Sequence, residues 1–175
     1  MPLDKKARLQ KLIEALGSLP PMEAKLMEVC GSHTMAIARS GLKSLLPEGT
    51  SLVSGPGCPV CVTPGQMIDA ALELSMERDV LTASYGDMLR VPGSRLGDSL
   101  SRRRALGARV EIVYSPADAV ELAAQNPGKE TVFLGVGFET SAPGTAAAIL
   151  TAKERGIKNF SVFSMLKRVG PALRT

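Results

Sequence analysis

The stretch Gly55-Pro56-Gly57-Cys58-Pro59-Val60-Cys61 is where the fold class of this chain is decided. Leu52-Val53, just before it, is typical of the end of a short buried strand, and residues 67–76, just after it, have the spacing of an amphipathic helix. The two cysteines are therefore expected in a turn at the exit of a strand, where α/β proteins commonly place their chemistry. Its prolines and glycines predict a stiff turn.

Strands and helices are predicted to alternate on both sides of this turn. Strands are expected over 25–30, 80–85, 109–114, 131–136 and from 160 onward, and helices over 4–16, 34–46, 67–77, 97–106, 116–125 and 143–155. This alternation predicts an α/β fold with a mostly parallel sheet flanked by helices. In such a sheet the segments after the strands share one edge, so we expect the segments of Cys30, Cys58, Asp87, Ser115 and Glu139 there.

Composition excludes several classes of protein. The 175 residues are 45% hydrophobic, yet no apolar run is long enough to cross a bilayer, and no apolar segment follows the N-terminal residues as in a secretory signal. Three cysteines without such a signal indicate a reducing cytoplasm. The net charge of +4 is scattered, and with only 3% aromatic residues nucleic-acid binding has little support.

The three cysteines are the candidate reactive groups. Cys58 and Cys61 have the spacing to close a disulfide ring, to chelate a metal, or to do both in turn, although an inert, half-buried pair is the alternative. Cys30 precedes a helix expected from Thr34, so its sulfur should face backbone N–H groups that favour the thiolate. His33, the only histidine, is a base, a hydrogen-bond donor or a metal ligand, or else it simply caps the helix.

Two further loops carry polar groups after predicted strands. The segment Gly135–Ser141 offers hydroxyls and the Glu139 carboxylate at a helix N-terminus. This arrangement suits anion binding or the positioning of a thiol. Alternatively, the segment is a tight turn with no further role. It lacks the complete fingerprint of a nucleotide-binding loop. Asp87 and Arg90 either line the same site or stabilise their own loop.

Five ordered motifs give this chain a resemblance to a known family. They are Met27–Thr34, Gly55–Pro64, Tyr85–Gly93, Ile112–Pro116 and Gly137–Thr140. With them the chain resembles the HypD family of [NiFe]-hydrogenase maturation factors from about residue 20 to its end. It departs from the family at Met35 and Leu166, where members often carry histidine.

The resemblance implies a scaffold rather than a turnover enzyme. On this scaffold an iron centre, Fe(CN)2CO, would be assembled together with a HypC-type chaperone and a HypE-type cyanide donor. Cys30 matches the iron-binding cysteine and Cys58 and Cys61 match the redox-active pair, which in the family exchanges electrons with a [4Fe-4S] cluster whose cysteines are absent here. The candidate catalytic residues are Cys58, Cys61, His33, Glu139 and Thr140, with Asp87 as a cofactor-binding residue and Cys30 as the metal ligand.

The resemblance also implies a division into domains. Residues 1–20 would form an N-terminal helix and linker, 21–128 a first α/β domain with the cysteine motifs, and 129–175 the start of a similar second domain. We therefore expect the chain to be about the first half of a longer protein. The alternatives are a thiol-disulfide oxidoreductase that uses Cys58 and Cys61, and an inactive half-protein.

Overall fold

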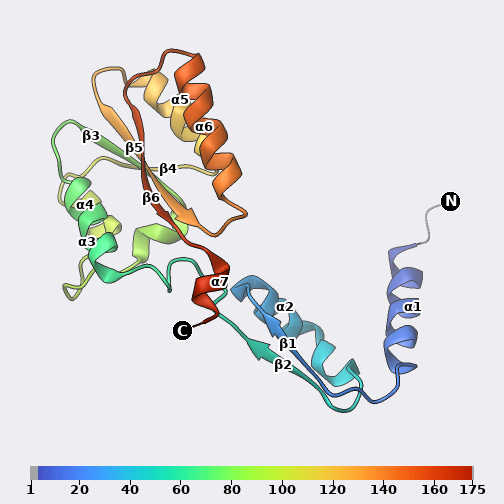
Figure 1. Cartoon of the computed structure of the whole chain (residues 1–175). Helices are drawn as coiled ribbons and strands as arrows, with labels where there is room; N and C mark the ends of the chain where they lie inside the picture. The colour runs from blue at the N-terminus through green and yellow to red at the C-terminus, as the bar shows by residue number, and fades with distance from the viewer. Residues whose placement is uncertain (1–3, 175) are drawn as a thin grey trace. The chain divides into compact units, whose positions relative to one another are not determined.

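The computed structural model describes residues 4–174, which form two compact units that divide after Cys58. Helices and strands alternate in both units, and every strand pair is parallel. Figure 1 shows helices beside both sheets. The α/β class predicted from the alternation is confirmed, but the strands form two sheets instead of one.

Unit 1, residues 4–58, contains a two-stranded sheet. Its elements are α1 (Lys5–Gly17), β1 (Ala24–Glu28), α2 (Gly31–Ser40), the 3-10 helix η1 (Leu42–Leu45) and β2 (Thr50–Ser54). The helix expected over 34–46 is interrupted because Gly41 takes the left-handed conformation, with φ 67°, which ends α2 and starts η1. In the sheet, Ala24 pairs with Thr50 and Glu28 with Ser54.

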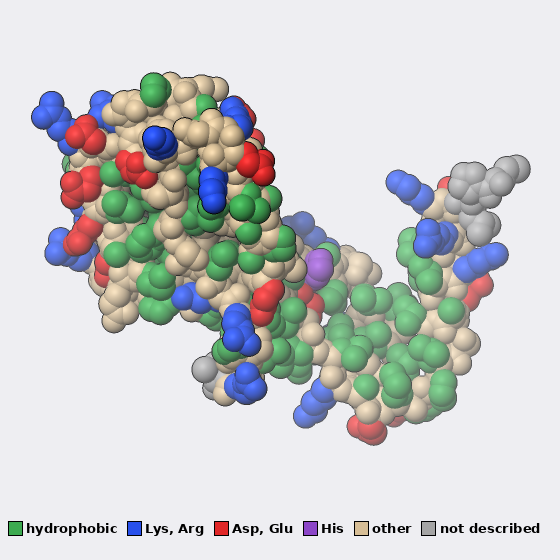
Figure 2. Space-filling model, turned by 45° about the horizontal axis from the view of Figure 1, so that its top comes forward, with side chains coloured by type: hydrophobic (Ala, Val, Ile, Leu, Met, Phe, Trp, Pro, Cys, Tyr) green, Lys and Arg blue, Asp and Glu red, His purple; other side chains and the backbone are tan. Residues whose placement is uncertain are grey.

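No described side chain of unit 1 is fully buried. Leu26 and Met27 of β1 remain 49% and 53% exposed, and Leu9 and Leu12 of α1 remain 58% and 56% exposed. In Figure 2, hydrophobic side chains gather on the visible surface of the lobe that carries α1. Parallel sheets are normally covered on both faces, so unit 1 lacks the core that its apolar residues could form.

Unit 2, residues 59–174, contains a four-stranded sheet in the order β4-β3-β5-β6. Its elements are α3 (Gly65–Leu74), β3 (Val80–Ser84), the 3-10 helix η2 (Gly86–Arg90), α4 (Leu100–Ala105), β4 (Val110–Ile112), α5 (Pro116–Gln125), β5 (Glu130–Gly137), α6 (Ala142–Glu154), β6 (Phe160–Leu166) and α7 (Val169–Ala172). The central strand β5 pairs with β3 from Val80 opposite Glu130, and with β6 from Thr131 opposite Phe160.

The core of unit 2 lies on both faces of β5. Leu134 packs with Leu72 of α3 and Met165 of β6, while its neighbour Phe133 points to the other face and packs with Ala119 of α5. Phe133, Leu134 and Met165 are each 0% exposed. Burying a side chain of this size contributes about 1.5–3 kcal/mol, so this sheet provides the stable platform of the chain.

The sheet of unit 2 brings several predicted site segments to one edge. Asp87, Ser115 and Glu139 follow β3, β4 and β5, whose parallel direction puts their carboxyl ends together. Cys30 and Cys58 follow β1 and β2 in the other sheet, so the expected common edge is divided between the two units. The domain boundaries at residues 20 and 128 stay a prediction; within unit 2, strands from both sides of residue 128 share one sheet.

Candidate metal centre

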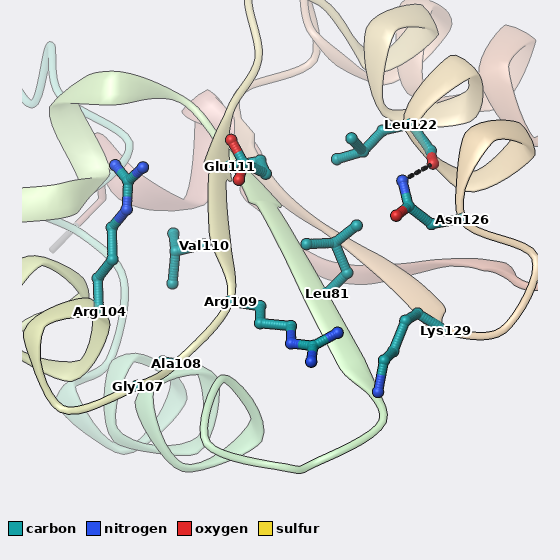
Figure 3. A pocket seen from close by; sticks show the side chains of 10 residues that line it. All are labelled: Leu81, Arg104, Gly107, Ala108, Arg109, Val110, Glu111, Leu122, Asn126 and Lys129. Atoms are coloured by element: carbon teal, nitrogen blue, oxygen red, sulfur yellow. Dashed lines mark hydrogen bonds between the residues drawn. The ribbon is translucent and has the colours of Figure 1, made fainter.

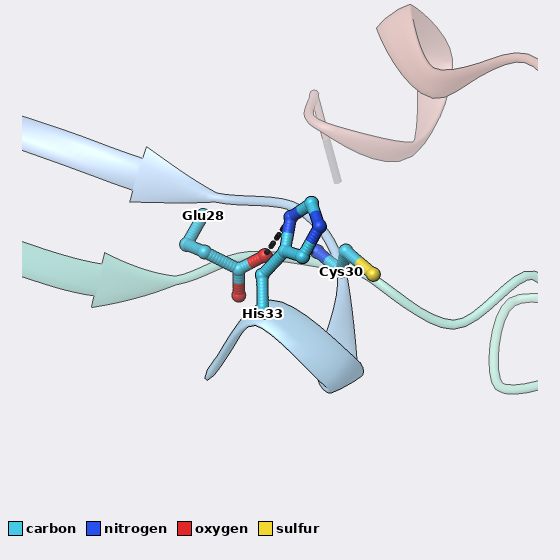
Figure 4. Close-up of side chains that lie close together, drawn as sticks. All are labelled: Glu28, Cys30 and His33. Carbon is cyan, nitrogen blue, oxygen red and sulfur yellow. Dashed lines mark hydrogen bonds and ion pairs between the residues drawn. The ribbon is translucent and has the colours of Figure 1, made fainter. Parts of the chain in front are cut away.

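Three potential metal ligands gather where β1 ends and α2 begins. Glu28 is the last residue of β1, Cys30 is the N-cap of α2, and His33 lies in the first turn of that helix. One carboxylate oxygen, the thiol sulfur and one ring nitrogen lie within 4.8 Å of one another (Figure 4). Carboxylate, thiolate and imidazole are ligands that suit iron or zinc, and small rotations of the side chains would bring them to bonding distance.

Glu28 is held in place by hydrogen bonds from the start of α2. Its Oε1 accepts a hydrogen bond from the backbone nitrogen of Cys30 at 2.6 Å, and its Oε2 accepts one from the Thr34 hydroxyl. The Nδ1 atom of His33 lies 3.7 Å from Oε1. The carboxylate is only 13% exposed, whereas His33 is 75% exposed, so Glu28 forms the fixed side of the cluster and His33 the adjustable side.

The start of α2 differs in one respect from the prediction. The helix begins at Gly31, three residues before the expected Thr34, and Cys30 is itself the N-cap in an extended conformation. Its side chain makes no capping hydrogen bond. The half-buried Cys30 sulfur is thus available for a ligand.

The glycine-rich turn after β2 packs against the backbone of Cys30. The Gly55 nitrogen donates to the carbonyl of Glu28 at 2.7 Å, and a Cβ atom on Gly57 would lie 2.5 Å from the Cys30 nitrogen. Only glycine permits so close an approach at residue 57. The backbone at Gly55 and Gly57 therefore packs against the segment that carries Glu28 and Cys30.

The two cysteines of the turn differ in exposure. Cys58 is half-buried and Cys61 is exposed, and the boundary between the two units falls directly after Cys58. On the side of Cys61, the Thr63 hydroxyl donates to the carbonyl of Pro59 at 2.8 Å, which closes a short turn before α3. The helix begins only at Gly65, so the pair lies ahead of the helix and not in its first turn.

Glu139, after β5, fixes the chain after β6. Both of its carboxylate oxygens accept from the backbone nitrogen of Val169, at 3.1 and 3.0 Å. The pKa of Glu139 is lowered, first by this N–H group, then by its own backbone N–H, and further by the charge of Arg168. Thr140 is exposed beside it. The structure thus gives Glu139 an anchoring role, while its predicted catalytic role, like that of Thr140, stays a prediction.

Asp87 is exposed in η2, after β3. The neighbouring Tyr85 packs edge-on against Phe133, with ring centroids 5.4 Å apart. Burial raises the pKa of Tyr85, and the negative charges of Asp87 and Asp118 raise it further. Asp87 therefore adds negative charge to this edge of the sheet, and its predicted cofactor-binding role stays a prediction.

A cavity of about 480 Å³ in unit 2 contains none of the predicted site residues. Its lining includes residues at the amino ends of the strands, with Ala108 and Arg109 just before β4 and Lys129 just before β5, together with residues from α4 and the end of α5 (Figure 3). Lys129 is already paired with Asp79 at 2.9 Å. The predicted site residues of unit 2 follow the opposite, carboxyl ends of the strands, so this cavity is not part of the candidate site.

Glu28 is the member of the cluster that the sequence interpretation did not select. A signal for it was present, because residues two apart in an extended strand point to the same side, and Glu28 precedes Cys30 by two. A carboxylate at that spacing from a candidate metal-binding thiol is itself a candidate ligand. The structure adds that the first turn of α2 brings His33 back to the same place.

The fold and this cluster define an α/β protein whose thiols lie at the exits of parallel strands, one of them beside a carboxylate and an imidazole. A family model confirms the resemblance drawn from the motifs. The HypD model, described as "Hydrogenase formation hypA family", matches residues 6–175. The chain belongs to the HypD family.

Several curated relatives are closely similar to this chain. The "Hydrogenase maturation factor HypD" of Rhodobacter capsulatus is 46% identical over 90% of the chain, that of Cupriavidus necator 51% over 82%, and that of Escherichia coli 46% over 86%. The chain spans 41%, 38% and 40% of the length of these relatives. Within residues 4–174, no helix is long and apolar enough to span a membrane.

Proposed function

We propose that this chain serves in hydrogenase maturation as a scaffold that binds iron, with Cys30 as the thiolate ligand. The observation that carries the proposal is the clustering of Glu28, Cys30 and His33, whose ligand atoms lie within 4.8 Å of one another. The names of the relatives, hydrogenase maturation factors, support the process in which the iron would be used.

Each residue of the cluster has a distinct part in this proposal. Cys30 supplies the thiolate, and His33, being largely exposed, turns to supply a ring nitrogen. Glu28, fixed by the Cys30 nitrogen and by Thr34, offers negative charge or an oxygen on the inner side. Bound iron would supply a centre able to hold cyanide and carbon monoxide, and the protein would orient it and shield one side.

The cysteine pair is the redox-active group in this proposal and exchanges electrons with a [4Fe-4S] cluster of the complete protein. Oxidation of the Cys58 and Cys61 thiols to a disulfide would release two electrons and two protons. The close approach of Gly57 to the Cys30 backbone supports a link between the pair and the cluster, because the residue before Cys58 is part of the wall around Cys30.

We propose the partners and the further cofactor of the complete protein from its membership of the HypD family. A HypC-type chaperone and a HypE-type cyanide donor would act with this chain in the cytoplasm to assemble the Fe(CN)2CO unit, and a [4Fe-4S] cluster elsewhere in the longer relatives would exchange electrons with the cysteine pair. Because the chain spans about two fifths of the relatives' length, these partners and cofactors are proposals for the complete protein.

Anaerobic titration of the purified chain with Fe(II) tests the iron site. Cys30→Ala should abolish iron binding, whereas Cys61→Ala, which also removes one thiol, should keep it. Infrared spectra after co-expression with a HypC-type chaperone should show cyanide and carbon monoxide bands that vanish in Cys30→Ala. Iron binding by a folded Cys30→Ala variant at the wild-type affinity would contradict the proposal.

A thiol-disulfide oxidoreductase is the second candidate function, because Cys61 is exposed to partners. In that case the chain would turn over a disulfide substrate, and loss of Cys30 would leave the rate unchanged. Such turnover, with no iron bound in either redox state, would favour this function over the scaffold.

A further inference from the structure

A pocket of about 400 Å³ is lined in part by Val62, the residue that follows the exposed Cys61, and neither the family resemblance nor the proposed iron site uses it. Its lining consists of Val62, Lys167, Arg168, Pro171 and Ala172, all in unit 2. Val62 directly follows Cys61, so their Cα atoms are about 3.8 Å apart. The pocket therefore borders the chain segment that carries Cys61, and an extended ligand anchored in it spans this short distance.

The pocket combines an apolar wall with two positive charges. Val62, Pro171 and Ala172 form the wall, and Lys167 and Arg168 bring the charges from the exit of β6. Among the described residues, neither cation forms a salt bridge.

Among residues 4–174, little negative charge compensates these two cations. Lys167 is half-buried, and its Nζ donates to the thioether sulfur of Met67 at 3.5 Å, which is a weak acceptor. The charge of Arg168 lowers the pKa of Glu139, a carboxylate that already accepts hydrogen bonds from the Val169 nitrogen. Within the described part of the chain, the two cations and the single carboxylate near them make the pocket suited to an anion.

Hydrogen bonds on either side hold these two cations in place. The Lys167 nitrogen donates to the carbonyl of Gly137 at 2.8 Å, and the Val169 nitrogen donates to the Glu139 carboxylate at 3.0 and 3.1 Å. The backbone of residues 167–169 is thus tied to the end of β5 at both ends. Because this backbone is already ordered, binding of a ligand would cause little further loss of conformational entropy in this part of the site.

We propose that this pocket binds a carboxylate and so directs carboxylate-bearing disulfides of low molecular weight to Cys61. The Cys61 thiol loses its proton to solvent, and the thiolate attacks one sulfur of the disulfide. A bond forms between Cys61 Sγ and that sulfur, the bond between the two ligand sulfurs breaks, and the second sulfur leaves as a thiolate. The iron site is not required, so this inference and the proposed scaffold can fail separately.

The experiment compares two aromatic disulfides on a chain with Cys61 as its only thiol, made by Cys30→Ser and Cys58→Ser. The reagents are 5,5′-dithiobis(2-nitrobenzoate), which carries carboxylates, and 4,4′-dithiodipyridine, which is neutral. Replacing Lys167 and Arg168 by glutamine should slow the carboxylate reagent about threefold or more and leave the neutral reagent unchanged. Benzoate should slow the carboxylate reagent by competition only while both cations are present.

The control is the double variant Arg78→Gln with Lys158→Gln, which removes the same charge at the amino ends of β3 and β6. It should leave the ratio of the two rates at its starting value. If the rate with the carboxylate reagent, relative to the rate with the neutral reagent, falls as much in this control as in the pocket variant, the proposal is overturned. An unchanged ratio of the two rates in the pocket variant also overturns it. If the single-thiol chain does not fold, mass spectrometry of Cys58→Ser after limited reaction, with and without the two glutamine substitutions, gives the same comparison from the fraction modified at Cys61, because no second thiol of the pair then displaces the reagent.

Discussion

Glu28 is the residue whose substitution most directly separates metal binding from folding. Its two oxygens accept from the Cys30 nitrogen and the Thr34 hydroxyl, and glutamine keeps one carbonyl acceptor of the same size while losing the charge. We expect Glu28→Gln to remain folded and to bind Fe(II) about 10- to 100-fold more weakly, as is typical when a supporting group of a metal site is lost. Anaerobic titration measures this change.

The control for Glu28 is Glu48→Gln, an exposed carboxylate of the same unit. It should leave iron affinity unchanged. If Glu28→Gln binds iron as tightly as the wild type, Glu28 only organises the start of α2 and takes no part in the metal site.

Gly57 and Gly31 form a matched pair for testing the turn that lies against Cys30. A Cβ on Gly57 would lie 2.5 Å from the Cys30 nitrogen and 2.7 Å from its Cα, whereas one on Gly31 would meet no atom within 4 Å. We expect Gly57→Ala to lower the free energy of unfolding by about 1–3 kcal/mol, because the crowded atoms are backbone and yield only if the turn moves.

Denaturant unfolding followed by circular dichroism measures both variants. Gly31→Ala should be neutral or slightly stabilising, since alanine favours the helical conformation more than glycine does. Equal stability of the two variants would mean that the turn does not pack against Cys30 in solution.

At the residue scale, the sequence was sufficient to find groups whose role depends on their own chemistry. Cys30 and His33 were selected as thiol and imidazole, and the structure brings them together. Glu28 has a sequence signal in its two-residue spacing from Cys30, but that spacing does not reveal the two hydrogen bonds that fix its carboxylate at the start of α2. The binding of Glu139 to Val169 spans 30 residues, and no local pattern could have predicted it.

At the scale of the element, the hydrogen bond that joins Glu139, after β5, to the first residue of α7 should stabilise the fold less in acid. The Val169 N–H lowers the pKa of Glu139 in the folded state, so its ionised form stabilises the fold at pH above the unfolded value and loses this effect as the pH falls through the folded value. We expect wild type to be more stable than Glu139→Gln at pH 7, with the difference disappearing in strongly acidic solution.

Melting temperatures of both proteins between pH 7 and pH 3 measure this difference. Glu154→Gln, an exposed change at the end of α6, should show no such pH-dependent difference from the wild type. A constant gap between wild type and Glu139→Gln across this range would show that the charge of Glu139 contributes nothing to the connection.

Most elements were predicted well because their signals are local. The capping box of Ser115 and Asp118 and the proline after it define the start of α5, which spans Pro116–Gln125 as expected. The apolar run of β5 is buried on both faces, as its composition indicates. The helix expected over 34–46 was wrong in its middle, since a glycine inside an apolar pattern either continues a helix or ends it, and Gly41 ends it.

At the scale of the whole molecule, the division of the strands into two sheets could not be predicted from the sequence. Periodicity reveals that a segment is a strand, but it does not identify the strand that pairs with it. The difference becomes visible only in burial, because β5 has seven buried positions and β1 has none. The sequence patterns of the strands are therefore alike in the two units, although the packing of those strands differs.

This difference in packing predicts that the two units open with different free energies. The amides of β3 and β5 are covered on both faces, and their opening exposes a core that includes Phe133 and Leu134. The amides of β1 and β2 belong to a two-stranded sheet without a fully buried side chain, so little apolar area opposes their opening. Native-state hydrogen exchange should show amides of Ala24–Glu28 exchanging at least about 100-fold faster than those of Thr131–Val136.

Leu134→Ala and Leu26→Ala extend this comparison. Leu134 is 0% exposed in the core, so its truncation should speed exchange across β3 and β5, whereas Leu26 is 49% exposed and its truncation should change exchange little anywhere. If β1 is as strongly protected as β5, its amides have cover that residues 4–58 do not themselves supply. Slow exchange of β1 that appears only when iron is bound would instead mean that the metal, through Glu28 and Cys30, stabilises the unit that carries it.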